Sequence, residues 1–160
     1  MFNVESYKGN REEKYQLVIK QLMALLEGEK NIIANLSNAS ALLNLFLDRI
    51  NWVGFYLVEN EELVLGPFQG LPACVRIPFG RGVCGTAAEK KETVCVEDVH
   101  QFPGHIACDA ASQSEIVVPL LKEDGTLLGL LDIDSPEKGR FDEIDQKYLQ
   151  QFVNSLIKFL

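Results

Sequence analysis

The placement of helix-like and strand-like segments constrains the fold of this chain more than any other feature of its sequence. Apolar residues over 11–26 recur at the spacing of one helix face, and a second such run extends over 31–47. Near the other end, Asp142 can cap a helix whose apolar stripe includes Leu149. Helices therefore flank a middle region of a different character.

The middle of the chain is rich in the β-branched and aromatic residues that strands favour. Its strand-like segments are 51–58, 62–67, 74–77, 93–96, 115–121 and 126–134. Turn-forming pairs at Glu59-Asn60 and Asp124-Gly125 predict two hairpins, so the sheet should be at least partly antiparallel. The pattern predicts an α+β protein with helices packed on a central, mostly antiparallel sheet of about six strands.

Length and composition are those of one globular domain. The 160 residues, 47% hydrophobic and 24% charged, can bury a core of their own, and no repeat or linker divides them. We therefore expect a single domain over 1–160. Its parts should be N-terminal helices over about 11–48, a sheet with site loops over about 51–134, and a C-terminal helix over about 142–159.

Charge and hydropathy limit the partners of the chain. A formal net charge of −8 argues against nucleic acid, which proteins bind through clustered Lys and Arg. The polar first residues do not resemble a signal peptide, and no apolar run approaches the ~20 residues of a membrane span. We expect a cytoplasmic protein with neither a nucleic-acid nor a membrane partner. In that reducing compartment, cysteines that do pair are usually catalytic or redox-sensing.

A two-residue turn at Asp124-Gly125 would place three carboxylates on one face of the sheet. With such a turn, Glu115 lies opposite Asp134 and Val117 opposite Asp132. Since side chains alternate along a strand, Glu115, Asp132 and Asp134 then share a face. Like charges weaken a sheet, so the cluster indicates a site that binds an ammonium group or keeps one carboxyl protonated as a proton donor. The structural alternative is the solvated face of an exposed hairpin.

An aromatic pair on the first predicted strand offers an apolar counterpart to the carboxylates. Trp52, Gly54 and Tyr56 share one face of that strand, while Val53 and Phe55 lie on the other. The missing side chain of Gly54 leaves an open space between two aromatic residues that a small ligand could fill. Trp52 and Tyr56 could equally be core residues.

The four cysteines lie in different kinds of segment. Cys84 is in a glycine-rich turn before a short Ala-rich helix, whose N-terminus would favour the thiolate and offer N–H groups to a carboxylate. Cys108 lies in the stretch 98–114, which lacks any regular period and is therefore typical of a functional loop. Cys74 begins a strand. Cys95 lies inside one, between two valines, which favours a core position.

Two other kinds of site could be built from these residues. The ligands of a zinc site would be Cys74, Cys84, Cys108, His100 and His105. No pair among them shows the short Cys-x2–4-Cys spacing that is typical of zinc sites. A cysteine protease would need one of the two histidines beside a thiolate, which sequence spacing does not indicate. We expect neither a metal nor another cofactor.

Eight short motifs surround the residues singled out above. They are ANLSN (34–38), GPFQG (66–70), ACVRIP (73–78), GRGVCGT (80–86), EDVH (97–100), HIACDAAS (105–112), SEIV (114–117) and LDIDS (131–135). Together they closely resemble the free methionine-(R)-sulfoxide reductases, which are stand-alone GAF-domain enzymes. The resemblance covers nearly the whole chain. Because GAF domains serve many ligands, the three cysteines with the carboxylates are its specific part, and Cys95 is not among them.

The resemblance implies reduction of free L-methionine (R)-sulfoxide to L-methionine, which protects against oxidative damage. It implies that the Cys108 thiolate attacks the sulfoxide sulfur and becomes a sulfenic acid, which a second thiol converts to a disulfide. Cys74 is favoured as that resolving thiol, with Cys84 as an alternative or relay. Thioredoxin would then restore the dithiol.

The resemblance also implies how the substrate is held. Trp52 and Tyr56 would enclose its methyl-sulfur end, and the carboxylates Glu115, Asp132 and Asp134 would contact its polar end. The carboxylate cluster would also supply the protons that the sulfoxide oxygen must gain.

Two questions stay open at this point. A GAF sensor that binds a small ligand or reports redox state without turnover is the alternative to an enzyme. The apolar helices could form the interface of a homodimer, or they could be needed inside the protein.

Overall fold

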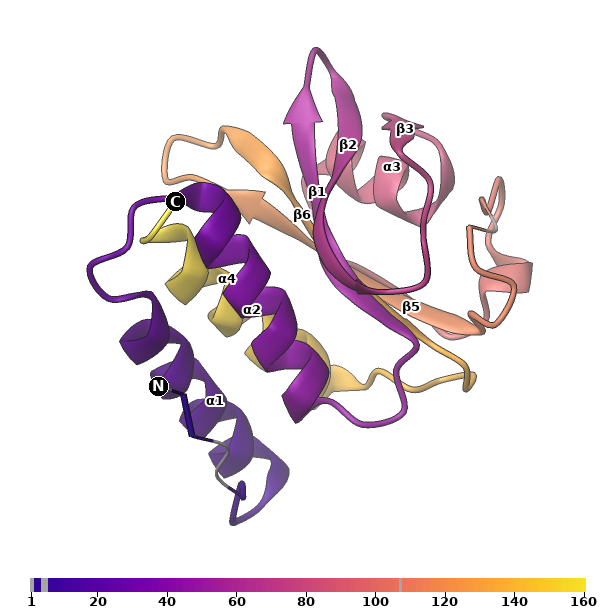
Figure 1. The fold of residues 1–160 in the computed structure, drawn as a ribbon. Helices are drawn as coiled ribbons and strands as arrows, with labels where there is room; N and C mark the ends of the chain where they lie inside the picture. Colours follow the sequence, from indigo (N-terminus) through magenta and orange to yellow (C-terminus); the bar gives the residue numbers. More distant parts are fainter. Residues whose placement is uncertain (1, 4–5, 107) are drawn as a thin grey trace.

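The computed structural model describes residues 2–3, 6–106 and 108–160 and contains a six-stranded sheet. Its strands are β1 (Trp52–Glu59), β2 (Glu62–Gly70), β3 (Arg76–Pro78), β4 (Val94–Val96), β5 (Ser114–Leu121) and β6 (Leu127–Ser135). They lie in the order β3-β2-β1-β6-β5-β4, and every neighbouring pair is antiparallel (Figure 1). The predicted α+β fold with about six mostly antiparallel strands is confirmed.

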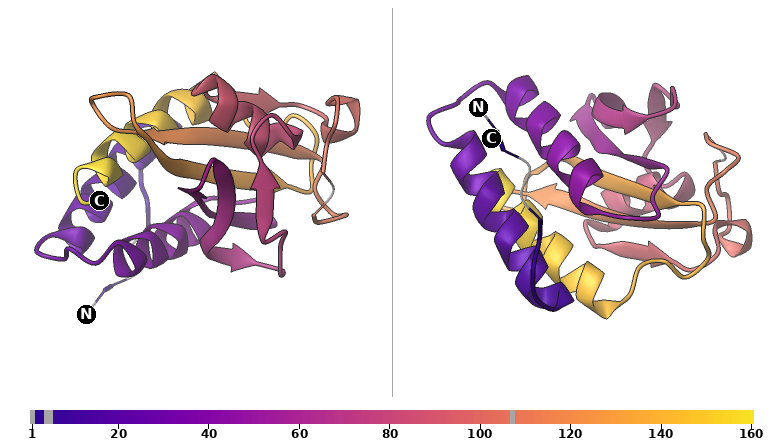
Figure 2. Two further views of the ribbon diagram at one scale, coloured as in Figure 1. Left: turned by 90° about the horizontal axis from the view of Figure 1, so that it is seen from above. Right: turned by 60° about the horizontal axis from the view of Figure 1, so that its bottom comes forward.

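Three long helices lie on one side of the sheet, two of them against it and one packed on those two, and a short helix lies on the other side (Figure 2). The long helices are α1 (Arg11–Leu26), α2 (Ile32–Phe46) and α4 (Glu143–Ile157). The short helix α3 (Gly82–Lys90) shares the opposite face with the 3-10 turn η1 (Val99–Gln101). The Asp142 side chain accepts a hydrogen bond from the Asp145 amide, which confirms that Asp142 caps the last helix.

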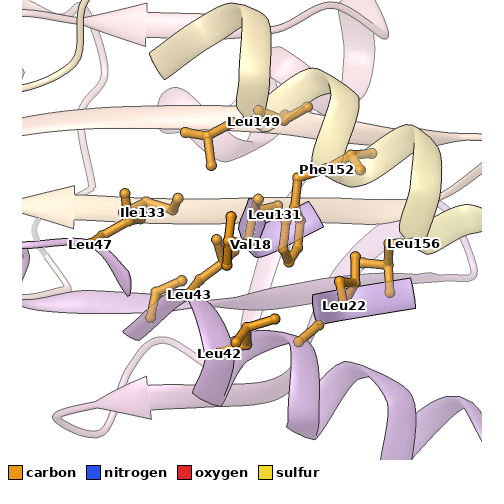
Figure 3. Packing of buried hydrophobic residues seen from close by; sticks show 14 of the residues in the cluster. Val18, Leu22, Leu42, Leu43, Leu47, Leu131, Ile133, Leu149, Phe152 and Leu156 are labelled. Carbon is orange, nitrogen blue, oxygen red and sulfur yellow. The ribbon is translucent and has the colours of Figure 1, made fainter. Parts of the chain in front are cut away.

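The apolar stripes of the long helices pack against the sheet and against one another and form the larger hydrophobic core (Figure 3). Val53 and Phe55 of β1 and Ile133 of β6 belong to it, together with Leu43 of α2 and Phe152 of α4. Each such buried side chain contributes roughly 1.5–3 kcal/mol to stability. These apolar helix faces are therefore needed inside the protein. None of the helices in the described residues is long and apolar enough to cross a membrane.

The opposite face of the sheet carries a second, smaller apolar cluster that surrounds the site. Trp52 and Tyr56 of β1 belong to this cluster, together with apolar side chains of α3. Val53 and Phe55 therefore lie on the opposite face of β1 from Trp52 and Tyr56, as predicted. The first pair faces the long helices, and the second faces α3.

The first hairpin forms, with a turn one residue later than predicted. Glu59 pairs with Glu62, so the turn residues are Asn60 and Glu61 rather than Glu59 and Asn60. Both turn residues have positive φ, at 51° and 62°. This is the backbone geometry that lets a two-residue turn follow the twist of the flanking strands.

The second hairpin places the carboxylates, although its turn also differs from the prediction. The Lys122 amide bonds to the Thr126 carbonyl, so the turn has three residues rather than two. A β-bulge near the turn leaves Leu128 as an extra residue in β6. The bulge offsets the longer turn, and Glu115 therefore lies opposite Asp134 as predicted.

Candidate active site

A pocket on the α3 side of the sheet brings together residues that are far apart in the sequence. Its walls include Trp52 and Tyr56 of β1, Glu115 of β5, Asp132 and Asp134 of β6, Cys84 of α3 and Cys108 of the loop after η1. All the predicted site residues except Cys74 therefore line one pocket, and Cys74 is bonded to Cys108.

Three carboxylates lie on the wall that β5 and β6 form. Glu115, Asp132 and Asp134 project from the same face of the sheet, as predicted. They are not a solvated surface, since only 6% of Glu115 and 5% of Asp132 is exposed. Burial first, and then the charges of Asp132 and Asp134, raise the pKa of Glu115 well above its usual range. The Glu115 carboxyl group therefore keeps its proton to a higher pH than an exposed one.

Asp132 has one oxygen that can still accept a hydrogen bond. Its Oδ1 atom is buried and has no hydrogen-bond partner among the described residues. One oxygen each of Glu115 and Asp132 and the sulfur of Cys84 lie within 4.8 Å of one another. A buried acceptor without a donor costs about 1–3 kcal/mol, which a ligand that brings a donor would recover. An ammonium group brings three N–H donors and a positive charge, so the cluster suits it.

Cys84 does not have the reactive thiolate that its position predicts. It lies in the first turn of α3, but burial and the negative charges of Asp132 and Glu115 raise the pKa of its thiol well above the usual value. Its Sγ atom donates a weak hydrogen bond to Oε2 of Glu115 over 3.7 Å. The prediction of a favoured thiolate is therefore wrong, because burial and negative neighbours outweigh the helix dipole.

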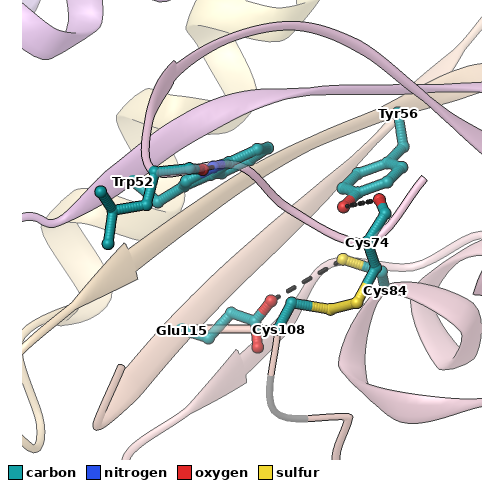
Figure 4. Close-up of a disulfide and its surroundings, with 7 residues drawn as sticks. Trp52, Tyr56, Cys74, Cys84, Cys108 and Glu115 are labelled. Carbon is teal, nitrogen blue, oxygen red and sulfur yellow. Dashed lines mark hydrogen bonds between the residues drawn. A yellow bond between two sulfur atoms is a disulfide. The ribbon is translucent and has the colours of Figure 1, made fainter. Parts of the chain in front are cut away.

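A disulfide joins Cys74 to Cys108 beside the pocket (Figure 4). The two residues are 34 apart in the sequence, and their Cα atoms are 5.6 Å apart, so two distant loops meet here. Cys84 is a free thiol in the same structure. Of the two redox partners left open for Cys108, the structure pairs it with Cys74. Cys95 is partly buried and packs against the helix-side core, away from the pocket, which confirms its predicted core position in part.

Asn51 ties the Cys108 loop to the sheet, a role to which nothing in the sequence points. Its Nδ2 group donates to Oδ2 of Asp109 at 2.9 Å and to Oγ of Ser112 at 3.2 Å. Asp109 also accepts a hydrogen bond from the Ala111 amide at 2.9 Å, which closes the turn after Cys108. An asparagine next to a strand is an ordinary feature, and only the fold brings this one beside the loop.

The structure does not assemble the alternative zinc or protease sites. Cys74 and Cys108 are bonded to each other, so in this disulfide state neither sulfur is a thiolate that could bind a metal or pair with a base. His105 lines the pocket, but its ring lies edge-on to that of His100, with the centroids 6.4 Å apart. Burial, and then the proximity of His100, lower the pKa of His105.

Comparison with known proteins shows the family. Residues 38–156 match the model of the GAF domain family. Over 151 residues the chain is 54% identical to the free methionine-R-sulfoxide reductase of Escherichia coli, covering 94% of this chain and 91% of that protein. The chain belongs to the free methionine-(R)-sulfoxide reductase family.

Solved structures of this reductase family have the same fold. The Neisseria meningitidis reductase in complex with its substrate is 45% identical, with a TM-score of 0.93 over 99% of this chain and 95% of that one. The Staphylococcus aureus reductase in complex with substrate is 54% identical, with a TM-score of 0.87 over 98% and 99% of the two chains. In both relatives this scaffold therefore holds a substrate.

In this member of the reductase family, protein atoms fill the space above Gly54. Phe68 of β2 pairs with Gly54, and a Cβ atom on Gly54 would lie 2.3 Å from the Phe68 Cβ atom. Trp52 stacks on the Phe68 ring, with 5.2 Å between the centroids. The predicted open space at Gly54 is therefore wrong, because its cross-strand neighbour occupies it. The glycine is needed so that Phe68 can approach.

The polar atoms of Trp52 and Tyr56 hold the segment 71–75, which carries Cys74. Tyr56 Oη donates a hydrogen bond to the Cys74 carbonyl at 2.8 Å (Figure 4). Trp52 Nε1 donates to the Leu71 carbonyl at 3.1 Å. Both aromatic rings also line the pocket, so the same two side chains shape the pocket and fix the backbone beside the disulfide.

Proposed function

We propose that this chain reduces free methionine (R)-sulfoxide to methionine in the cytoplasm, with thioredoxin as the reductant. The observation that carries the proposal is the Cys74–Cys108 disulfide beside a pocket lined with buried carboxyl groups. The family supports the substrate, since the relatives in E. coli and N. meningitidis are named for that activity. Cys108 is the nucleophile and Cys74 the resolving thiol.

In the first step the Cys108 thiolate attacks the sulfoxide sulfur, and a proton on the sulfoxide oxygen makes that sulfur more electrophilic. Glu115 is the proton donor, because its buried carboxyl group keeps a proton to a higher pH than usual. The oxygen passes to Cys108 as a sulfenic acid, and methionine leaves as a thioether. In the second step the Cys74 thiol attacks the sulfenic sulfur, which forms the disulfide and releases the oxygen as water.

The pocket selects a free amino acid rather than a peptide residue. Asp132 and Asp134 bind the substrate ammonium group, which supplies a donor to the unpartnered Oδ1 atom of Asp132. Trp52 and Tyr56 enclose the methyl-sulfur end. A peptide amide would bring one N–H group and no charge, so it would leave buried acceptors without partners.

Cys74 suits the resolving role better than Cys84 does. The Cys84 thiol is buried, and its raised pKa keeps it protonated beside Glu115. A protonated thiol is a poor nucleophile toward a sulfenic acid. Cys84 instead donates its S–H group to the Oε2 atom of the Glu115 carboxyl group.

Tyr56→Phe is expected to slow disulfide formation about tenfold, because the segment that carries Cys74 loses a hydrogen bond worth about 1 kcal/mol or slightly more. Sulfoxide reduction should stay close to wild type, since the ring remains. Single-turnover reactions analysed by mass spectrometry for sulfenic acid and disulfide separate these steps. Tyr148→Phe, which removes a hydroxyl group on the helix side of the sheet, is the matched control. Equal slowing of both steps would assign the Tyr56 hydroxyl to fold stability alone.

Turnover with the two epimers of the substrate tests the proposed function directly. Purified protein, thioredoxin, thioredoxin reductase and NADPH are mixed with free methionine (R)- or (S)-sulfoxide. We expect NADPH consumption above the no-substrate control with the R epimer only. A sensor would bind a ligand without turnover, so consumption at the level of the control with both epimers would contradict the proposal.

A further inference from the structure

Two exposed apolar side chains flank Cys74, and the reaction with sulfoxide gives them no role. Leu71 is 64% exposed and Val75 is 61% exposed, the highest values among the large apolar residues of the described chain. Pro72 and Ala73 between them line the pocket, whereas Leu71 and Val75 do not. Single exposed apolar residues are ordinary, but a pair on both sides of a redox cysteine indicates a contact surface.

The two sulfurs of the disulfide have different surroundings. Both cysteines are partly exposed, but Cys108 lines the pocket, whereas Cys74 lies outside its lining. In thiol–disulfide exchange, access decides which sulfur is attacked. Another protein is too large to enter the pocket. A thiol that such a protein carries therefore reaches Cys74 more readily than Cys108.

A positive charge lies beside this surface, on a chain whose net charge is −8. Arg81 is exposed and lines the pocket together with Pro72 and Ala73. It forms no ion pair within the described ranges. Arg81 can therefore attract an incoming thiolate and stabilise the Cys108 thiolate that exchange releases.

We propose that Leu71 and Val75, with Arg81 beside them, form the docking surface for a dithiol reductase of the thioredoxin class. This inference rests on the proposed function. The thiolate of the partner attacks Sγ of Cys74, the bond to Cys108 breaks, and the Cys108 sulfur leaves as a thiolate. The second thiol of the partner then attacks the mixed disulfide, so the partner is oxidised and Cys74 is released as a thiol. Apolar contact with Leu71 and Val75 holds the partner during the exchange.

The double variant Leu71→Ser/Val75→Ser tests this surface and keeps the backbone carbonyls of both residues. With thioredoxin, its reductase and NADPH, we expect the KM for thioredoxin to rise about tenfold. With dithiothreitol, which needs no docking surface, turnover should match the wild type. The control Ile33→Ser/Leu45→Ser removes two apolar side chains of similar exposure from α2 and should change neither measurement.

An unchanged KM for thioredoxin in the double variant would overturn the docking surface and leave the proposed function standing. If the wild type did not turn over free methionine (R)-sulfoxide with dithiothreitol, the proposed function would be contradicted instead. A lower molar mass of the double variant in light scattering would also overturn the surface, because Leu71 and Val75 would then join two copies of the chain.

A trapping experiment tests which sulfur is attacked. A thioredoxin that lacks its second cysteine should be trapped on Cys74, and trapping on Cys108 would contradict the assigned direction of attack.

Discussion

Replacement of Cys108 by serine is expected to abolish sulfoxide reduction with either thioredoxin or dithiothreitol. A serine hydroxyl is a far weaker nucleophile than a thiolate, and it forms neither a sulfenic acid nor a disulfide. The rate of methionine formation, followed by chromatography, should fall by at least about a thousandfold. Substantial activity with dithiothreitol would mean that another thiol attacks the substrate, and Cys84 would be the first candidate.

Cys74→Ser is the matched control for that experiment, because it removes the other half of the same disulfide. This variant should still complete one round of sulfoxide reduction, after which mass spectrometry should find one added oxygen on Cys108. Dithiothreitol should then restore the Cys108 thiol, whereas turnover with thioredoxin should be strongly impaired. Full thioredoxin-driven turnover in Cys74→Ser would transfer the resolving role to Cys84.

Glu115→Gln is expected to slow the reduction step about a hundredfold while disulfide recycling stays near the wild-type rate. Glutamine has almost the same shape as glutamic acid, but it cannot transfer a proton to the sulfoxide oxygen. Single-turnover methionine formation measures the first step, and reduction of the preformed disulfide by thioredoxin measures the second. If both steps slow equally, Glu115 is not the acid.

The same variant should be more stable than the wild type at neutral pH. Burial and two neighbouring carboxylates raise the pKa of Glu115 above its ordinary value of 4.5, so from that pH upward the folded state binds more protons than the unfolded state. Stability falls as pH rises through this window, and glutamine, which does not titrate, removes the loss. The gain in Tm should therefore grow as pH rises above about 5. A gain that did not change with pH would show that titration of Glu115 is not its cause.

Local periodicity along the chain predicts the helices and the direction of each strand side chain. Helix α1 has the bounds expected from its apolar stripe, and Trp52 and Tyr56 project away from the long helices as alternation requires. The shared face of Glu115 and Asp134 also follows from alternation. It does so although the turn is longer than predicted, because a bulge at Leu128 restores the register.

Contacts between segments that are distant in the sequence determine the features of the site that local sequence patterns do not predict. Phe68 fills the space at Gly54 because β2 lies next to β1, and no pattern within β1 reveals this. The Cys84 thiol in α3 has a raised pKa because it is buried and because Asp132 of β6 and Glu115 of β5 lie beside it. Asn51 holds the Cys108 loop only because the fold brings that loop to the end of β1.

The two faces of the sheet give this protein two largely separate sets of mutable positions. Val53 and Phe55 project toward the long helices, and their substitution would change resistance to heat without touching the pocket. The opposite face carries Glu115 and Asp132, whose burial lowers stability. Laboratory evolution could therefore first raise heat tolerance on the helix side. With this added stability, the protein would then tolerate substitutions in the pocket that alter which sulfoxides it accepts.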